Sequence, residues 1–214
     1  NPKNLKVSEE DDLKPLNPYA ETKLKLENYL INQSKFDKIK YIILRYFNVA
    51  GADPKMRSGL ISKKATHLIK IASEVAVGKR KDITIFGNDY PTPDGTAIRD
   101  YIHVSDLADI HVKSIKYLTK YKKSMLLNCG YGKGYSIKQV VEIFKKSNYK
   151  NFSYSFAKAR PGDISYMVAD TYKINKILNW KPKFLNLEKM LISELKWKKK
   201  IKNYRDKYKV TLAN

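Results

Sequence analysis

Cysteine and long apolar runs are scarce in this sequence. The single cysteine, Cys129, excludes a disulfide within the chain, and its apolar neighbours Met125–Leu127 predict a buried, reduced thiol. No stretch approaches the roughly 18 consecutive apolar residues of a membrane-spanning helix, and no apolar segment follows a basic N-terminal start. We therefore expect a soluble, cytoplasmic protein that is not bound to a membrane.

Acidic residues are also few, so the net charge is +22. Such a charge is typical of nucleic-acid-binding proteins. However, only six of the basic residues are arginines, which recognise bases and bind phosphates better than lysines do. The lysines are spread along the chain, apart from Lys196–Lys200 and the residues up to Lys209, which we interpret as the solvated end of a helix. We expect no nucleic-acid partner. The alternative, a basic module for single-stranded nucleic acid, predicts an affinity that falls steeply with salt.

The predicted elements alternate as in an α/β protein. Asn17 is a favoured N-cap and Pro18 suits the first helical turn, so a helix is expected from Pro18 to about Ser34. The β-branched and aromatic run Ile39–Phe47 predicts a buried strand of a parallel sheet, and ligands gather where such strands end. The other expected elements are a helix over 64–77 closed by Gly78, strands over 83–86 and 99–104, a helix through 107–118, a strand over 125–129, a Gly-rich turn over 130–134, a helix after Ser136, a strand over 152–156, and helices over 171–178 and 187–200.

Tyr19 and Lys23 stand four residues apart in the first turns of the expected helix. The same spacing occurs at Tyr154/Lys158 and Tyr172/Lys176, and about three such pairs are expected by chance in a chain so rich in Tyr and Lys. The first pair follows the start signal of Asn17 and Pro18 and shares a stripe with Leu26 and Leu30, so we expect it to face inward. A phenol beside an ammonium can act as a general base for chemistry that needs a redox cofactor. The alternative is a core tyrosine beside a lysine whose stem alone is buried.

Four segments in order resemble the sugar-nucleotide epimerases of the extended short-chain dehydrogenase/reductase class. They are Pro18–Lys23, Leu44–Gly51, Ile85–Val104 and Arg160–Asp163, and the third is the most specific. The likeness continues to about Lys200. It implies an α/β fold made of the C-terminal part of a Rossmann-like doubly wound parallel sheet and a smaller mixed α/β substrate-binding domain.

The resemblance also implies a division of the chain. Residues 1–55 would be the C-terminal remnant of an NAD-binding Rossmann domain, and residues 56–214 would mainly bind UDP-sugar, with about 97–118 packing back on the Rossmann part. The family's Gly-rich NAD-binding turn has no counterpart here, and Ser8 does not stand where the family has its catalytic Ser or Thr. We therefore expect a C-terminal fragment that lacks roughly the first third of the enzyme and does not turn over alone.

The implied activity is an isomerase of galactose metabolism that interconverts UDP-glucose and UDP-galactose. Tyr19, activated by Lys23, would take the proton from the sugar 4-hydroxyl while hydride passes from C4 to tightly bound NAD. The 4-keto sugar would then rotate and be reduced on its other face. Another UDP-sugar 4-epimerase, or a related sugar-nucleotide enzyme of the same class, is the alternative. The family further implies a homodimer.

The residues implied for the site fall into two sets. Cofactor contacts are carried over to Tyr19, Lys23, Tyr46 and Phe47, and substrate contacts to Asn48, Thr66, His67, Leu68, Thr84, Ile85, Phe86, Arg99, Arg160 and Asp163. The two arginines suit a diphosphate, because a planar guanidinium binds oxyanions in pairs. The alternatives are a salt bridge from Arg99 to Asp100 or Asp106 and a helix cap at His67. No metal site is expected, since neither His103 nor His111 has a partner at ligand spacing.

Overall fold

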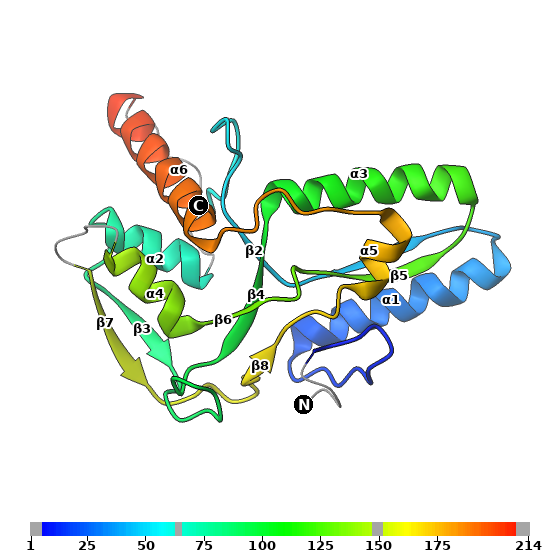
Figure 1. The fold of residues 1–214 in the computed structure, drawn as a ribbon, viewed down its shortest axis with the longest axis horizontal. Helices are drawn as coiled ribbons and strands as arrows, with labels where there is room; N and C mark the ends of the chain where they lie inside the picture. The colour runs from blue at the N-terminus through cyan, green and yellow to red at the C-terminus, as the bar shows by residue number, and fades with distance from the viewer. Residues whose placement is uncertain (1–5, 63–65, 147–151, 209–214) are drawn as a thin grey trace.

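The computed structural model describes residues 6–62, 66–146 and 152–208. Helices and strands alternate along the chain, and Figure 1 labels them in order. Their bounds are α1 Pro18–Phe36, β1 Ile42–Tyr46, β2 Asn48–Ala50, α2 Leu68–Ala76, β3 Asp82–Phe86, β4 Ile98–His103, α3 Val104–Tyr121, β5 Met125–Cys129, β6 Gly134–Ser136, α4 Ile137–Lys146, β7 Ser153–Ala157, β8 Tyr166–Met167, α5 Tyr172–Leu178 and α6 Leu187–Tyr208. The prediction of an α/β fold with parallel strands is confirmed.

Three small sheets carry the strands. β1 pairs in parallel with β5, and β3 pairs in parallel with β7. In the third sheet β4 is central: it pairs in parallel with β2 and β8 and antiparallel with β6. Because β4 touches three strands from distant parts of the sequence, it fixes the position of residues 48–50 and 166–167 relative to one another.

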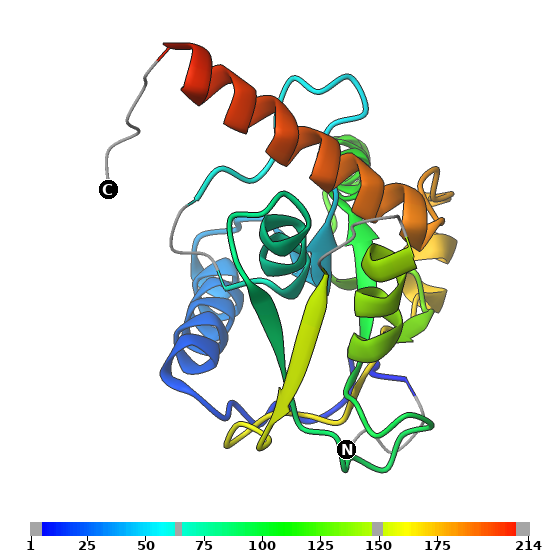
Figure 2. The same ribbon diagram turned by 90° about the vertical axis from the view of Figure 1, so that its left-hand side faces the viewer.

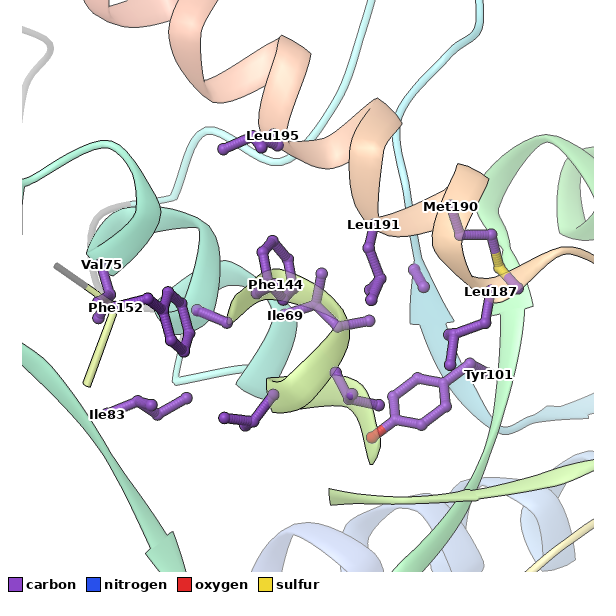
Figure 3. Close-up of a cluster of buried hydrophobic side chains, with 14 of the residues drawn as sticks. Ile69, Val75, Ile83, Tyr101, Phe144, Phe152, Leu187, Met190, Leu191 and Leu195 are labelled. Carbon is purple, nitrogen blue, oxygen red and sulfur yellow. The ribbon is translucent and has the colours of Figure 1, made fainter. Parts of the chain in front are cut away.

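Two hydrophobic clusters hold these sheets to their helices. The first joins α2, α4 and α6 to β3 and β4 through Ile69, Phe144, Leu191, Ile83 and Tyr101, as Figure 3 shows. Figure 2 shows α2 and α4 next to the β3–β7 pair, with α6 lying beyond them. The second cluster packs α3 and α5 on β5. The division into residues 1–55 and 56–214 stays a prediction.

Two expected elements differ in their bounds. The expected strand over residues 39–47 is β1 alone, with the shorter bounds Ile42–Tyr46, and it pairs with β5. After a break at Phe47 a separate strand, β2, begins at Asn48 and pairs with β4. The strand is also less buried than predicted, and Tyr46 is 56% exposed. The helix expected over residues 64–77 begins only at Leu68, and residues 63–65 lie outside the described residues. Its end at Gly78 is as predicted, with a positive φ of 73°.

The predicted inward stripe of α1 is wrong. None of the α1 residues, all of which the structure describes, is buried, and Leu26 is 61% exposed. One half-buried contact between α1 and the sheet is an ion pair, in which the Arg45 guanidinium of β1 meets the Glu27 carboxylate, and Leu30 of the stripe is half-buried. A period of apolar residues shows which face seeks cover, but it does not show what covers that face.

The Gly-rich run at residues 130–134 forms a turn, as predicted, and its N–H groups bind an anion that belongs to the protein. The buried Asp100 carboxylate of β4 accepts hydrogen bonds from Tyr131 N, Gly132 N and Ala169 N at 2.8–3.3 Å. Gly130 permits this approach, because a Cβ there would lie 2.5 Å from Asp100 Oδ2. Within the described ranges, no helix combines the length and apolar character that a membrane span requires.

Candidate functional site

A cavity of about 620 Å³ opens where β1 and β2 end. This size lies within the usual range for small-molecule sites. Its wall combines α1, the β1–β2 segment, the 58–60 loop, the start of α2, β4 and α6. The lining residues are Tyr19, Tyr46, Phe47, Asn48, Val49, Ala50, Gly51, Ser58, Gly59, Leu60, His67, Leu68, Ile69, Lys70, Tyr101, Val104 and Glu194.

Tyr19 is placed on this wall by the start of α1. The Asn17 side chain accepts a hydrogen bond from Ala20 N at 2.9 Å, so the helix begins where the sequence predicts. Tyr19 is 70% exposed, and the Lys23 ammonium lies 5.1 Å from the centre of its ring. Lys176 lies 5.5 Å from the Tyr172 ring in the same way. The ammonium–phenol geometry is therefore not specific to the first pair, whereas a position on the cavity wall is.

Six of the predicted residues line the cavity together, namely Tyr19, Tyr46, Phe47, Asn48, His67 and Leu68. His67 stands at the N-cap position of α2, but its side chain makes no capping hydrogen bond. Thr66 is exposed next to it. Ser8 does not belong to the wall, and its hydroxyl accepts a hydrogen bond from Glu10 N within its own turn.

A second group of predicted residues gathers between β3, β4 and the 158–165 loop. The Arg160 guanidinium lies 3.8 Å from the centre of the Phe86 ring, and Arg99 Nη2 lies 3.6 Å from Asp163 Oδ1. The alternative in which Arg99 pairs with Asp100 or Asp106 is wrong. Those two carboxylates are occupied by backbone N–H groups, and Asp106 also accepts from the Tyr131 hydroxyl.

The strand β3 contributes unequally to this group. Thr84 is exposed, whereas Ile85 is 1% exposed and its side chain belongs to the hydrophobic cluster around α2. The side chain of Ile85 is therefore not available to a ligand, and Ile85 can contribute only backbone groups to a site along β3. β4 connects the two groups, because Arg99 and Tyr101 are two residues apart and lie on one face, about 7 Å apart.

The loop that forms one wall of the cavity is tied to α6. Lys198 Nζ donates to Leu60 O at 3.1 Å, and Lys200 Nζ donates to Met56 O at 2.7 Å. Gly59 allows the close approach, since a Cβ there would lie 2.5 Å from the Trp197 ring. The interpretation of the 196–200 segment as a solvated face is wrong for Lys198, which is only 6% exposed. Lys209 lies outside the described residues.

Sequence reasoning missed a buried carboxylate on the cavity wall. Glu194 of α6 is 3% exposed, and its Oε1 has no hydrogen-bond partner within the described part of the chain. Burial raises the pKa of Glu194 to about 7, against the attraction of the Lys198 ammonium. The signal was present in the sequence, because position 194 continues the apolar stripe of Leu187, Met190 and Leu191. A charged residue in such a stripe calls for an explanation.

Known proteins resemble this chain over most of its length. Residues 2–130 match the NAD dependent epimerase/dehydratase family. A UDP-glucose 4-epimerase from Azospirillum brasilense is 43% identical over 200 residues, which are 94% of this chain and 58% of that relative.

Solved structures agree with this match. A UDP-glucose 4-epimerase from Bifidobacterium longum in complex with NAD+ and UDP superposes with a TM-score of 0.88 at 38% identity, covering 94% of this chain and 61% of that one. The UDP-Glc/GlcNAc 4-epimerase from Campylobacter jejuni superposes with a TM-score of 0.74 at 43% identity, covering 93% and 60%. The fold is thus the Rossmann-like fold of these epimerases, and the chain spans about 60% of the length of such relatives.

Proposed function

The chain belongs to the NAD dependent epimerase/dehydratase family, and we propose that its two residue groups are the catalytic and nucleotide-binding parts of a UDP-glucose 4-epimerase site. The proposed reaction interconverts UDP-glucose and UDP-galactose. Relatives of that name, and the structure from Bifidobacterium longum with NAD+ and UDP, support the choice. The observation that carries it is the position of Tyr19 on one cavity wall with Asn48 and Phe47.

Tyr19 is the proposed catalytic base. Its phenolate accepts the proton of the sugar 4-hydroxyl and returns it after the sugar has turned. The Lys23 ammonium lies 5.1 Å from the centre of the Tyr19 ring, one helical turn further along α1. Asn48 is exposed on the same wall, where its amide can hydrogen-bond a sugar hydroxyl.

The residues present fit a nicotinamide ring. Tyr46 and Phe47 form an aromatic stretch of the wall beside Tyr19, and such rings pack well on a flat heterocycle. NAD bound here would accept a hydride from the sugar and give it back. Tyr19, Lys23, Tyr46 and Phe47 are the proposed cofactor contacts.

Arg160, Phe86, Arg99 and Asp163 are the proposed nucleotide contacts. A guanidinium stacked on Phe86 stays oriented, and it offers paired N–H donors to a diphosphate. Arg99 is mostly covered, with 14% of its side chain exposed, so solvent weakens its interaction with an anion only partly. Thr66, His67, Leu68, Thr84 and Ile85 complete the proposed substrate set. The homodimer and the cytoplasmic location stay predictions.

The proposal is tested by replacing Tyr19 and by a matched control. The assay measures conversion of UDP-glucose to UDP-galactose with NAD, in this chain and in a fusion with the part of the Azospirillum brasilense relative that the chain does not span. In the active form, Tyr19→Phe should lower kcat by at least about 100-fold, the usual worth of a general base. Tyr172→Phe removes an equally exposed phenol beside a lysine and should leave kcat unchanged. The proposal would be contradicted if neither the chain nor the fusion converted UDP-glucose, or if Tyr19→Phe and Tyr172→Phe changed kcat equally.

A further inference from the structure

Glu194 carries a buried carboxyl oxygen, Oε1, that no group of the described residues satisfies. It is 3% exposed, it lies on the wall of the cavity, and Oε1 finds no partner in the described residues. Buried polar atoms in native proteins are nearly always hydrogen-bonded, to the protein, to water or to a ligand. An orphan carboxyl oxygen at a cavity therefore indicates that something with a hydrogen-bond donor occupies the neighbouring space.

The surrounding charges are committed to other partners. Lys70 Nζ of α2 lies 2.9 Å from the Glu74 carboxylate, which Arg80 also contacts at 2.8 Å. Lys198, one turn beyond Glu194 on α6, donates to Leu60 O. These are the charged groups that act on Glu194 from α2 and from its own helix. Lys198 and Lys70 reduce the cost of burying the carboxylate and Glu74 increases it, and Oε1 has no hydrogen-bond partner among the described residues.

The composition of the wall favours a carbohydrate over an anion as occupant. A carboxylate repels phosphate, and the proposed diphosphate contacts, Arg99 and Arg160, are not on this wall. Sugar hydroxyls are neutral donors that an acceptor-only carboxylate can bind. The buried hydroxyl of Tyr101, another residue of the wall, also lacks a partner among the residues described.

We propose that Glu194 is a specificity-determining residue that accepts a hydrogen bond from a hydroxyl group of the hexose of the UDP-sugar. The inference rests on the proposed function, which places the hexose in the cavity next to Tyr19 and Asn48. It adds a contact from α6, an element to which neither the sequence nor the family resemblance assigned a site residue. Glu194 holds the sugar and takes no part in proton transfer.

The test separates the hexose from the nucleotide. Calorimetric titration of the chain with UDP and with UDP-glucose gives two dissociation constants. The dissociation constant for UDP divided by that for UDP-glucose, called the ratio below, measures how much the hexose strengthens binding. Glu194→Leu removes the acceptor, and Glu194→Gln keeps one acceptor oxygen without charge. Glu188→Leu and Glu188→Gln are matched controls, because Glu188 is exposed in the first turn of the same helix.

We expect the ratio to fall about tenfold in Glu194→Leu, which is the change in affinity expected when one hydrogen bond to a charged group is lost. The ratio should fall less in Glu194→Gln. The affinity for UDP should stay constant in all four variants. An unchanged ratio in folded Glu194→Leu would overturn the inference and leave the carboxyl with a water or a purely structural role. Failure of the unsubstituted chain to bind UDP would overturn the proposed function and the inference with it.

A second measurement decides the matter if Glu194→Leu does not fold. Between about pH 6 and pH 8 the Glu194 carboxyl gains its charge, and a charged acceptor binds a hydroxyl more strongly than a neutral one. The ratio in the unsubstituted chain should therefore rise with pH, while the ratio in Glu194→Gln stays flat. Parallel profiles for the two proteins would overturn the inference.

Discussion

The stability that Glu194 contributes to the folded chain should fall as pH rises, because its carboxyl must ionise inside the protein. The pKa of Glu194 is raised from 4.5 to about 7 in the folded chain, mainly by burial. A raised pKa means that the folded chain holds this proton more tightly than the unfolded chain does. The resulting stability is fully present below pH 4.5 and is lost as pH rises through about 7.

The magnitude follows from the size of this shift. At about 1.4 kcal/mol per pH unit, a shift from 4.5 to about 7 is worth roughly 3 kcal/mol. Between pH 5 and pH 8 the loss is roughly 2–3 kcal/mol, since at pH 5 the unfolded chain has already begun to release the proton. For a chain of this length, that loss corresponds to about 5–10 °C in Tm.

Glu194→Gln tests this reasoning by removing the titration while keeping the shape of the side chain. Urea unfolding at pH 5 and pH 8 gives the free energy of unfolding of both proteins, and every other titrating group cancels in their difference. We expect the difference in the free energy of unfolding between the variant and the unsubstituted chain to move in favour of the variant by roughly 2–3 kcal/mol from pH 5 to pH 8. Glu188→Gln, on the exposed side of the helix, should show no such movement. An equal difference at the two pH values would refute the argument that Glu194 ionises in a buried environment.

Two further predictions concern backbone geometry and a buried carboxylate. Gly95→Ala should lower the free energy of unfolding by well over about 1 kcal/mol, since φ is +75° and the new Cβ would lie 2.1 Å from a backbone oxygen. Gly78→Ala, at φ +73° with open space around it, should lower it by only about 1 kcal/mol. Equal shifts of the two variants in thermal melts would contradict this. Asp100→Asn should lower the free energy of unfolding by about 2 kcal/mol in urea titrations, because an amide oxygen replaces a charged acceptor of three backbone N–H groups. Asp89→Asn, at an exposed position, should change it by almost nothing. Similar losses in the two variants would argue against the role of Asp100 as an acceptor for the backbone.

Local signals in the sequence located the starts of α1 and α4. Ser136 accepts from Gln139 N at 3.0 Å while Gln139 Oε1 accepts from Ser136 N at 2.8 Å, so the start of α4 is set by four neighbouring residues. Asn17 and Pro18 set the start of α1 in the same way. Such features are readable because donor and acceptor lie within one turn of each other.

Features that depend on distant partners were not readable. The apolar run over residues 39–47 gives no sign of where β1 ends, because that break is set by pairing with residues 125–129 on one side and 101–103 on the other. The Gly-rich turn likewise showed only that the backbone bends. That its N–H groups hold the carboxylate of Asp100, about thirty residues earlier, follows from the sheet and not from the spacing of the glycines.

The Tyr–Lys pairs make the same point for the site. Tyr19/Lys23 and Tyr172/Lys176 share their spacing, their exposure of about 70% and a ring–ammonium distance near 5 Å, and both begin a helix. Local chemistry therefore gives the two phenols the same properties in isolation. They differ in what the rest of the chain brings to them: Tyr19 shares a cavity with Asn48, His67 and a buried carboxylate, and Tyr172 is not on that wall. If Tyr19→Phe and Tyr172→Phe differ in activity, we attribute the difference to this tertiary environment, because the two pairs share their spacing, their exposure and their ring–ammonium distance.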